Sequence, residues 1–88
     1  MVDLSKHAAE LIRTLVHDSD LSKSAGLRLG TDDDTHALAM NLEAAPREDD
    51  VVVEHDGAAV WVSPLATARL AHRTLDAQLE PRPAFFLD

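Results

Sequence analysis

The sequence contains no cysteine in its 88 residues. The chain can therefore form no disulfide, offer no thiolate nucleophile and bind no metal through thiolate ligands. Its apolar runs are also short, far below the roughly 20 residues that span a bilayer, so we expect no membrane-spanning helix and no membrane partner. Residues 1–5 lack a basic segment followed by an apolar one. We therefore expect no secretory signal and a cytoplasmic location.

Basic residues are scarce, because eight Lys and Arg stand against 16 Asp and Glu, giving a formal net charge of −8. Nucleic acid attracts proteins chiefly through Lys and Arg, so we expect no nucleic-acid partner. The acidity would suit a basic protein partner. Catalytic patterns are missing as well: there is no Gly-x-Ser-x-Gly and no phosphate-binding glycine loop. We expect no enzymatic activity and no cofactor.

What the sequence does contain is a strong hairpin signal in residues 51–62. Two β-rich runs flank Asp56-Gly57, a dipeptide that favours a two-residue turn in which both residues have positive φ. Side chains alternate along strands, so Val53 and Val60 should share the face that lines the space between two sheets. Trp61 and Val52 should share the other face, beneath a helix or in a subunit interface. We favour burial of Trp61 within the protomer.

Two helices are predicted. Apolar residues recur at helical spacing from about residue 5 to residue 17, and Ser5 is the expected N-cap. The second helix follows the hairpin directly. Ser63 can cap it, and Pro64 suits the first helical position, where the missing N–H of proline costs nothing.

The remaining strands form two further hairpins. Residues 25–29 alternate and predict a strand, 30–35 read as a polar loop, and 37–42 predict the partner strand although their composition also suits a helix. Residues 75–79 and 84–87 predict the last two strands, around a turn that holds two prolines. The order is therefore helix, hairpin, hairpin, helix, hairpin, within one domain that spans residues 1–88.

This order, with several local strings, resembles the HesB/IscA-like family of A-type iron–sulfur cluster carriers. The run from Leu4 to Ala9, with the apolar residues after it, is similar to the first helix of the family. Ala25–Leu29 is similar to its Gly-hydrophobic-Arg/Lys-hydrophobic strand, and Val52–Pro64 to its central hairpin and second helix start. Leu75-Asp76-Ala77 is similar to the dipeptide that opens its penultimate strand. The resemblance covers nearly the whole chain.

The resemblance implies a mainly β (α+β) fold: a two-layer β-sandwich or partly open barrel of about six strands, with an N-terminal helix and a second short helix. It also implies dimers or tetramers, and three cysteines that bind iron or a cluster. The first cysteine position falls at about Thr35, beside His36, and the chain ends at Asp88, before the segment that would carry the other two. All three thiolates are absent, and a hydroxyl is a poor replacement for the soft ligand that cluster iron prefers.

Histidine and aspartate offer a different kind of metal site. His36 and His55 are both expected at loop or turn ends, and Asp34 belongs to the acidic triplet 32–34. Together they could hold zinc or ferrous iron through nitrogen and oxygen atoms. The ordinary alternative is two exposed turn histidines and a solvated loop.

The sequence thus indicates a cysteine-less relative of the iron–sulfur carriers. We expect a non-enzymatic accessory or interaction protein whose partners are components of iron–sulfur cluster assembly. The alternative function is direct binding of iron or zinc through His36, His55 and Asp34.

Overall fold

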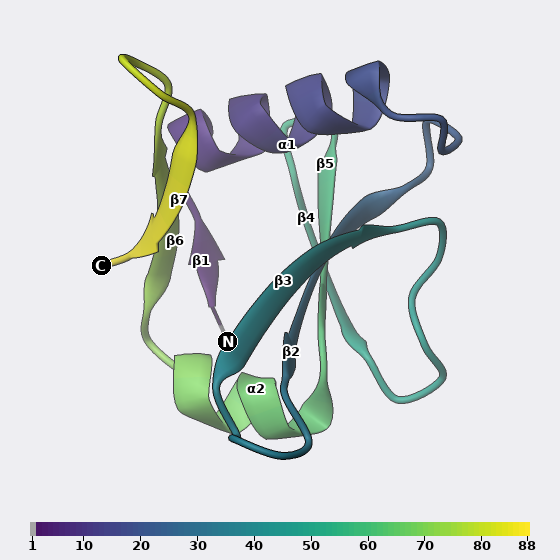
Figure 1. The fold of residues 1–88 in the computed structure, drawn as a ribbon, viewed down its shortest axis with the longest axis vertical. Helices are drawn as coiled ribbons and strands as arrows, with labels where there is room; N and C mark the ends of the chain where they lie inside the picture. The colour runs from purple at the N-terminus through teal and green to yellow at the C-terminus, as the bar shows by residue number, and fades with distance from the viewer. Residues whose placement is uncertain (1) are drawn as a thin grey trace.

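The computed structural model describes residues 2–88, which form two sheets and two helices. Figure 1 shows how these elements are arranged. The elements in chain order are β1 (Asp3–Leu4), α1 (Lys6–Asp18), β2 (Gly26–Thr31), β3 (Leu38–Glu43), β4 (Val51–His55), β5 (Ala58–Val62), α2 (Pro64–Leu70), β6 (Thr74–Gln78) and β7 (Ala84–Leu87). This is the α+β, two-sheet fold that the resemblance implied. Among the described residues, no helix is long and apolar enough to cross a membrane.

Both helices begin where their caps predict. The Ser5 hydroxyl accepts a hydrogen bond of 3.0 Å from the Ala8 N–H, and α1 runs one residue beyond the predicted end. The Ser63 hydroxyl accepts one of 3.2 Å from the Ala66 N–H, and Pro64 is the first residue of α2. These hydroxyls satisfy N–H groups that have no partner inside a helix.

The central hairpin has the predicted turn and register. Asp56 and Gly57 have φ of 49° and 77°, as a two-residue turn of this type requires. Val53 pairs with Val60, and Val52 pairs with Trp61. The dipeptide therefore set the pairing of the two strands, as predicted.

The four-stranded sheet has the order β3-β2-β5-β4, in which β2 is antiparallel to β3 and parallel to β5. The predicted hairpin of β2 and β3 is confirmed. The boundary of its loop was wrong, because β2 continues through Gly30 and Thr31, which pair with Ala39 and Leu38. Polar composition suggested a loop there, but pairing with β3 holds these residues in the ladder.

The three-stranded sheet has the order β1-β6-β7. The last two predicted strands are confirmed as an antiparallel pair that flanks the two prolines. The short β1, parallel to β6, was not predicted. Two residues are too few to show an alternating pattern, so only the neighbouring strand defines β1.

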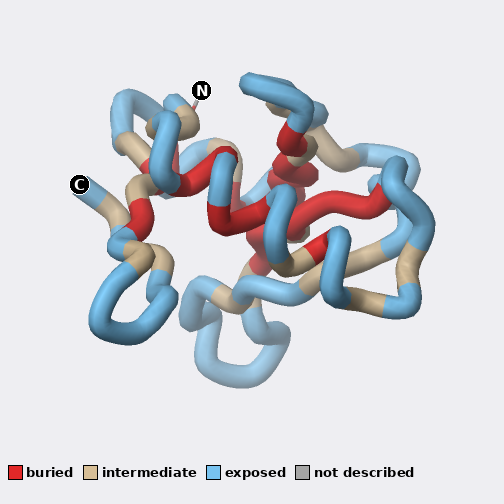
Figure 2. The backbone as a smooth tube through the Cα atoms, turned by 90° about the horizontal axis from the view of Figure 1, so that it is seen from above, coloured by how far each residue is buried: buried red, intermediate tan, exposed pale blue. Residues whose placement is uncertain are grey.

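The core lies between α1 and the two sheets. Figure 2 shows the buried residues gathered in the middle of the molecule and the exposed ones in the surrounding loops. Ile12 of α1, Val60 and Val62 of β5 and Leu75 of β6 are almost fully buried and belong to one apolar cluster. The predicted interior face of the hairpin is therefore confirmed.

Trp61 is only 3% exposed within the single chain, as we expected. It lies on the opposite sheet face from Val60, as the register predicted, and it is not part of the main apolar cluster. The buried residues of α1 share the main apolar cluster with Val60, on the sheet face opposite Trp61. Val52, on the same face as Trp61, is 45% exposed in the single chain, so burial within the protomer holds for Trp61 but not for Val52. β4 is an edge strand, whereas β5 lies between β2 and β4.

Candidate functional site

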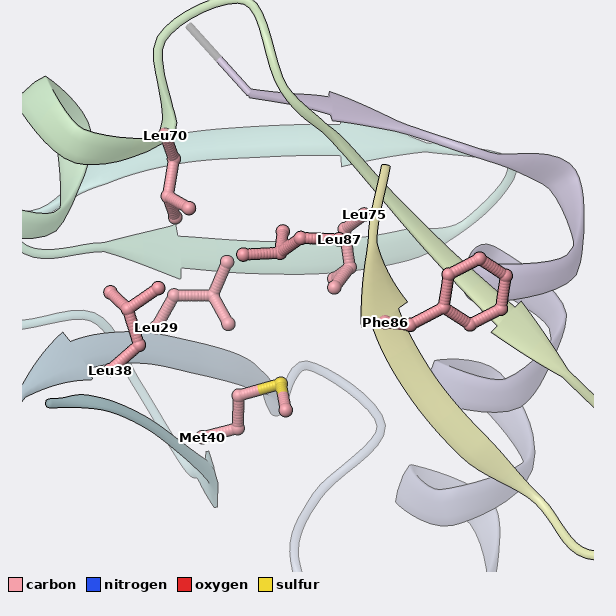
Figure 3. A pocket seen from close by; sticks show the side chains of 7 residues that line it. All are labelled: Leu29, Leu38, Met40, Leu70, Leu75, Phe86 and Leu87. Atoms are coloured by element: carbon pink, nitrogen blue, oxygen red, sulfur yellow. The ribbon is translucent and has the colours of Figure 1, made fainter.

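An apolar groove opens between the two sheets. Its volume is about 220 Å³, and we call it the inter-sheet groove. Its lining is entirely hydrophobic: Leu29, Leu38, Met40, Leu70, Leu75, Phe86 and Leu87. Figure 3 shows Leu38 and Met40 on one side and Leu75 and Leu87 across from them, with the Phe86 ring directed away from Met40 at the rim. The groove therefore offers shape and apolar surface, and no group that could do chemistry.

Strand order explains why this surface is open. Among residues 2–88, β3 pairs with β2 alone and β7 pairs with β6 alone, so each is the last strand of its sheet on this side. Leu38 and Met40 lie opposite Thr31 and Leu29, on the face of β3 directed to the interior. They remain 37% and 46% exposed, and Phe86 of β7 is 46% exposed. Apolar side chains that gather on one exposed surface often mark a contact site.

The β2–β3 loop carries Thr35 and His36, both exposed. The Asp32 carboxylate accepts hydrogen bonds from the N–H groups of Asp34 and Thr35, at 2.8 and 3.0 Å. The bond from Thr35, and then that from Asp34, holds the pKa of Asp32 below its usual value of 3.8. His36 has a φ of 60°, and its carbonyl accepts a hydrogen bond from Arg69 of α2. The loop is thus fixed by its own backbone and by α2.

The structure does not bring the predicted metal ligands together. β2 and β5 run parallel, so the β4–β5 turn and the β2–β3 loop lie at opposite ends of the sheet. His36 and Asp34 belong to that loop, whereas His55 ends β4 and lies 3.6 Å from the Asp56 carboxylate. Within residues 2–88 no group of three His, Asp or Glu side chains is placed to hold a metal ion. The metal hypothesis gains no support from the geometry.

A polar cluster that sequence reasoning missed lies on the outer face of the four-stranded sheet. The Arg28 guanidinium donates two hydrogen bonds of 3.0 Å to the Asp50 carboxylate, whose side chain is almost fully buried. The Arg47 N–H donates a third at 2.9 Å. Burial raises the pKa of Asp50, but the bonds from Arg28 and Arg47 outweigh it and hold the pKa below 3.8. The pairing spans 22 residues, so no local pattern announced it.

A second cavity, of about 240 Å³, lies between α1 and the β4–β5 turn. Arg13, His17 and Lys23 line it together with apolar residues of the core. Arg13 uses its guanidinium to donate a hydrogen bond to the Asp56 carbonyl, which ties the turn to α1. This contact has an evident structural role, since it holds the hairpin against the helix.

No family model and no curated protein matches this sequence. Solved structures do match it. SufA of Escherichia coli, which is involved in the biosynthesis of iron–sulfur clusters, is 27% identical with a TM-score of 0.76, and the match covers 99% of this chain and 83% of SufA.

Two further structures have the same fold. IscA with a [2Fe–2S] cluster is 19% identical with a TM-score of 0.67, over 100% of this chain and 84% of IscA. A protein from Aquifex aeolicus, determined in solution, is 18% identical with a TM-score of 0.70, over 99% of this chain and 89% of that protein. The resemblance predicted from the sequence is thus confirmed, and this cysteine-free chain is a structural match to the SufA/IscA (HesB-like) family along its full length.

Proposed function

We propose that this chain is a non-enzymatic accessory protein of iron–sulfur cluster assembly that acts through protein contacts. The observation that carries this proposal is its similarity to E. coli SufA over 99% of the chain, combined with the absence of cysteine. The similarity supports a role in the same process. The missing thiolates remove the ligands that cluster iron prefers, so the role differs from holding a cluster.

The described residues offer no substitute set of ligands. Thr35, at about the position of the first family cysteine, presents a hydroxyl on an exposed loop. The nearby Asp32 carboxylate already accepts two backbone hydrogen bonds. In residues 2–88 no three His, Asp or Glu side chains converge. The donor set does not fit an iron–sulfur cluster, whereas the exposed apolar residues of the inter-sheet groove fit a role in protein contacts.

A reconstitution experiment tests the first half of the proposal. The purified chain is incubated anaerobically with ferrous iron and sulfide, then desalted, and its visible spectrum is recorded beside that of E. coli SufA treated identically. We expect no persistent absorption band for this chain because it supplies no thiolate. A stoichiometric band that survives desalting would show that the chain holds a cluster and would contradict the proposal.

An experiment in the native cell tests the second half. Deletion of the gene should lower the activity of a [4Fe–4S] dehydratase during growth on limiting iron, while the amount of that enzyme protein stays unchanged. Expression of the wild-type chain should restore the activity. Equal dehydratase activity with and without the chain would place it outside cluster assembly.

A further inference from the structure

Two unpaired strand edges border the inter-sheet groove. β3 is the last strand of the order β3-β2-β5-β4, and β7 is the last of β1-β6-β7. Both lie on the same side of the molecule, nearest the viewer in Figure 1. An edge strand presents N–H and C=O groups that can pair with another extended segment. The groove therefore combines apolar surface with backbone groups available for pairing.

The side-chain pattern of β3 indicates how a segment would lie there. Leu38 and Met40 point to the groove side, and Ala39 and Asn41, between them in register, point to the other face. A strand added beside β3 would follow the same alternation, so every second side chain would lie over the groove. The side chains between them would lie on the solvent side of the sheet.

The charge around the groove distinguishes two candidate occupants, a second copy of this chain and a basic segment of another protein. The acidic residues 32–34 lead into β3, and Asp88 follows β7. Two basic side chains, Arg69 and Arg73, also lie at this end and donate to the carbonyls of His36 and Asp88, but the four exposed carboxylates of residues 32–34 and 88 outnumber them. A second copy of the chain would bring another net charge of −8, whereas a basic segment would be attracted.

We propose that the inter-sheet groove binds an extended segment of a partner protein that pairs with the free edge of β3, placing apolar side chains in the groove with Lys or Arg alternating between them. This inference deepens the proposed function, and it rests on that function only for the process in which the partner works. The binding itself can be tested without cells or clusters.

Selection from a displayed library of random ten-residue peptides identifies the preferred segment. The library is selected on the wild-type protein after depletion on the variant Met40→Glu. We expect enriched peptides in which apolar and basic residues alternate. Enrichment of acidic or helically spaced peptides, or no enrichment over the depleted library, would overturn the proposal.

The most enriched peptide, labelled with fluorescein, is then titrated against matched variants. Met40→Glu should weaken its binding about tenfold or more, because a charge in the groove cannot pack against an apolar side chain. Leu65→Glu adds the same charge at a residue that is 67% exposed in α2, and it should leave the affinity within about twofold. Purely Coulombic attraction predicts tighter binding for both variants, which would refute insertion into the groove.

Backbone methylation of the peptide tests strand pairing while leaving the protein unchanged. Methyl groups on the peptide nitrogens that face β3 should weaken binding about tenfold or more, since they remove the donors. Unchanged affinity would exclude strand addition.

Sedimentation of the wild type and of Met40→Glu tests for a second copy. We expect the same mass for both; a dimer that Met40→Glu dissociates would assign the groove to self-association instead. A normal dehydratase activity in the deletion strain would refute the proposed function and leave peptide binding intact, so the two failures are distinguishable.

Discussion

β3 and β4 are the two edges of one four-stranded sheet, and each directs apolar side chains to the interior face. On β4, Val51 and Val53 are half-buried and pack against the core cluster. On β3, Leu38 and Met40 line the open groove and stay 37% and 46% exposed. The two edges have similar alternation but different surroundings, since Arg13 of α1 holds the β4–β5 turn against the helix.

The two edge strands also differ in how well they are protected against pairing with strands of other molecules. β4 ends in Glu54 and His55, which are exposed and polar, and a tight turn follows them. β3 carries a charge only at its last residue, Glu43. Natural proteins usually blunt an edge strand with charges or cover it, because unpaired edges invite association. β3 exposes two large apolar side chains, Leu38 and Met40, against Val52 alone on β4, so the edge of β3 is the more informative one for function.

The largest loss of stability that tests this comparison of β3 with β4 is expected from a substitution in the β4–β5 hairpin. Trp61→Ala should lower the free energy of unfolding by about 3–5 kcal/mol, because it leaves a large cavity at a residue that is 3% exposed. Urea denaturation at two protein concentrations measures this. The loss should be the same at both, since the burial is within one chain. A variant that stays stable but dissociates from an oligomeric parent would show that Trp61 stabilises an interface instead.

The next largest loss of stability is expected in residues 44–50, which connect β3 to β4. Asp50→Asn should lower the free energy of unfolding by about 1.5–3 kcal/mol at pH 7, because it weakens charge-assisted bonds to Arg28. The exposed Asp49→Asn is the matched control and should change little.

The pH dependence of that difference follows from the lowered pKa of Asp50. The ionised carboxylate contributes stability above its unfolded-state pKa of about 3.9, and this contribution is lost as the pH falls through the lower folded-state pKa. The urea midpoints of wild type and Asp50→Asn should therefore differ most at neutral pH, and the difference should shrink as the pH falls below about 3.9. A constant difference across this range would mean that the charge of Asp50 is not the cause.

The β4–β5 turn gives a third effect. Gly57→Val should cost about 1–3 kcal/mol of unfolding free energy, because a β-branched residue is strained at a φ of 77°. Gly57→Asn should cost less, since Asn tolerates the left-handed region. Urea midpoints of the two variants compare them directly. Equal midpoints would contradict the role assigned to this turn.

The smallest expected loss of stability comes from a direct comparison of one side chain on each edge strand. Val53→Ala should cost about 1–2 kcal/mol because Val53 packs against the core. Met40→Ala removes a larger side chain, yet it should cost less than about 1 kcal/mol, since Met40 is 46% exposed. Denaturation of both variants in parallel checks the order. A greater loss for Met40→Ala would mean that the groove is closed by the chain itself.

Local signals in the sequence were sufficient for most of the fold. The turn at Asp56-Gly57 specified which residues pair across the hairpin, and the caps Ser5 and Ser63 specified where the helices begin. These are interactions between residues close in the chain, which residue type alone selects. The end of β2 and the two-residue β1 could not be predicted, because partner strands define them.

The candidate site depended much less on local pattern. His36 and His55 were grouped because both were expected at turns, but the parallel pairing of β2 and β5 places their turns at opposite ends of the sheet. Leu38 and Met40 read as an ordinary apolar face of a strand. Nothing along the chain indicated that this face meets an open space beside β7, since the two strands lie in different sheets.

By itself the sequence determined the order of helices and hairpins, the register of the central hairpin, and the absence of thiolate ligands in these 88 residues, because turn chemistry, capping and residue identity act over a few residues. Only the tertiary structure decided that Trp61 is buried while Val52 is exposed, that Asp50 neutralises Arg28, and that an apolar groove stays open beside β3. The physical reason is that exposure depends on which distant element covers a residue, and that is settled when the sheets and helices pack together.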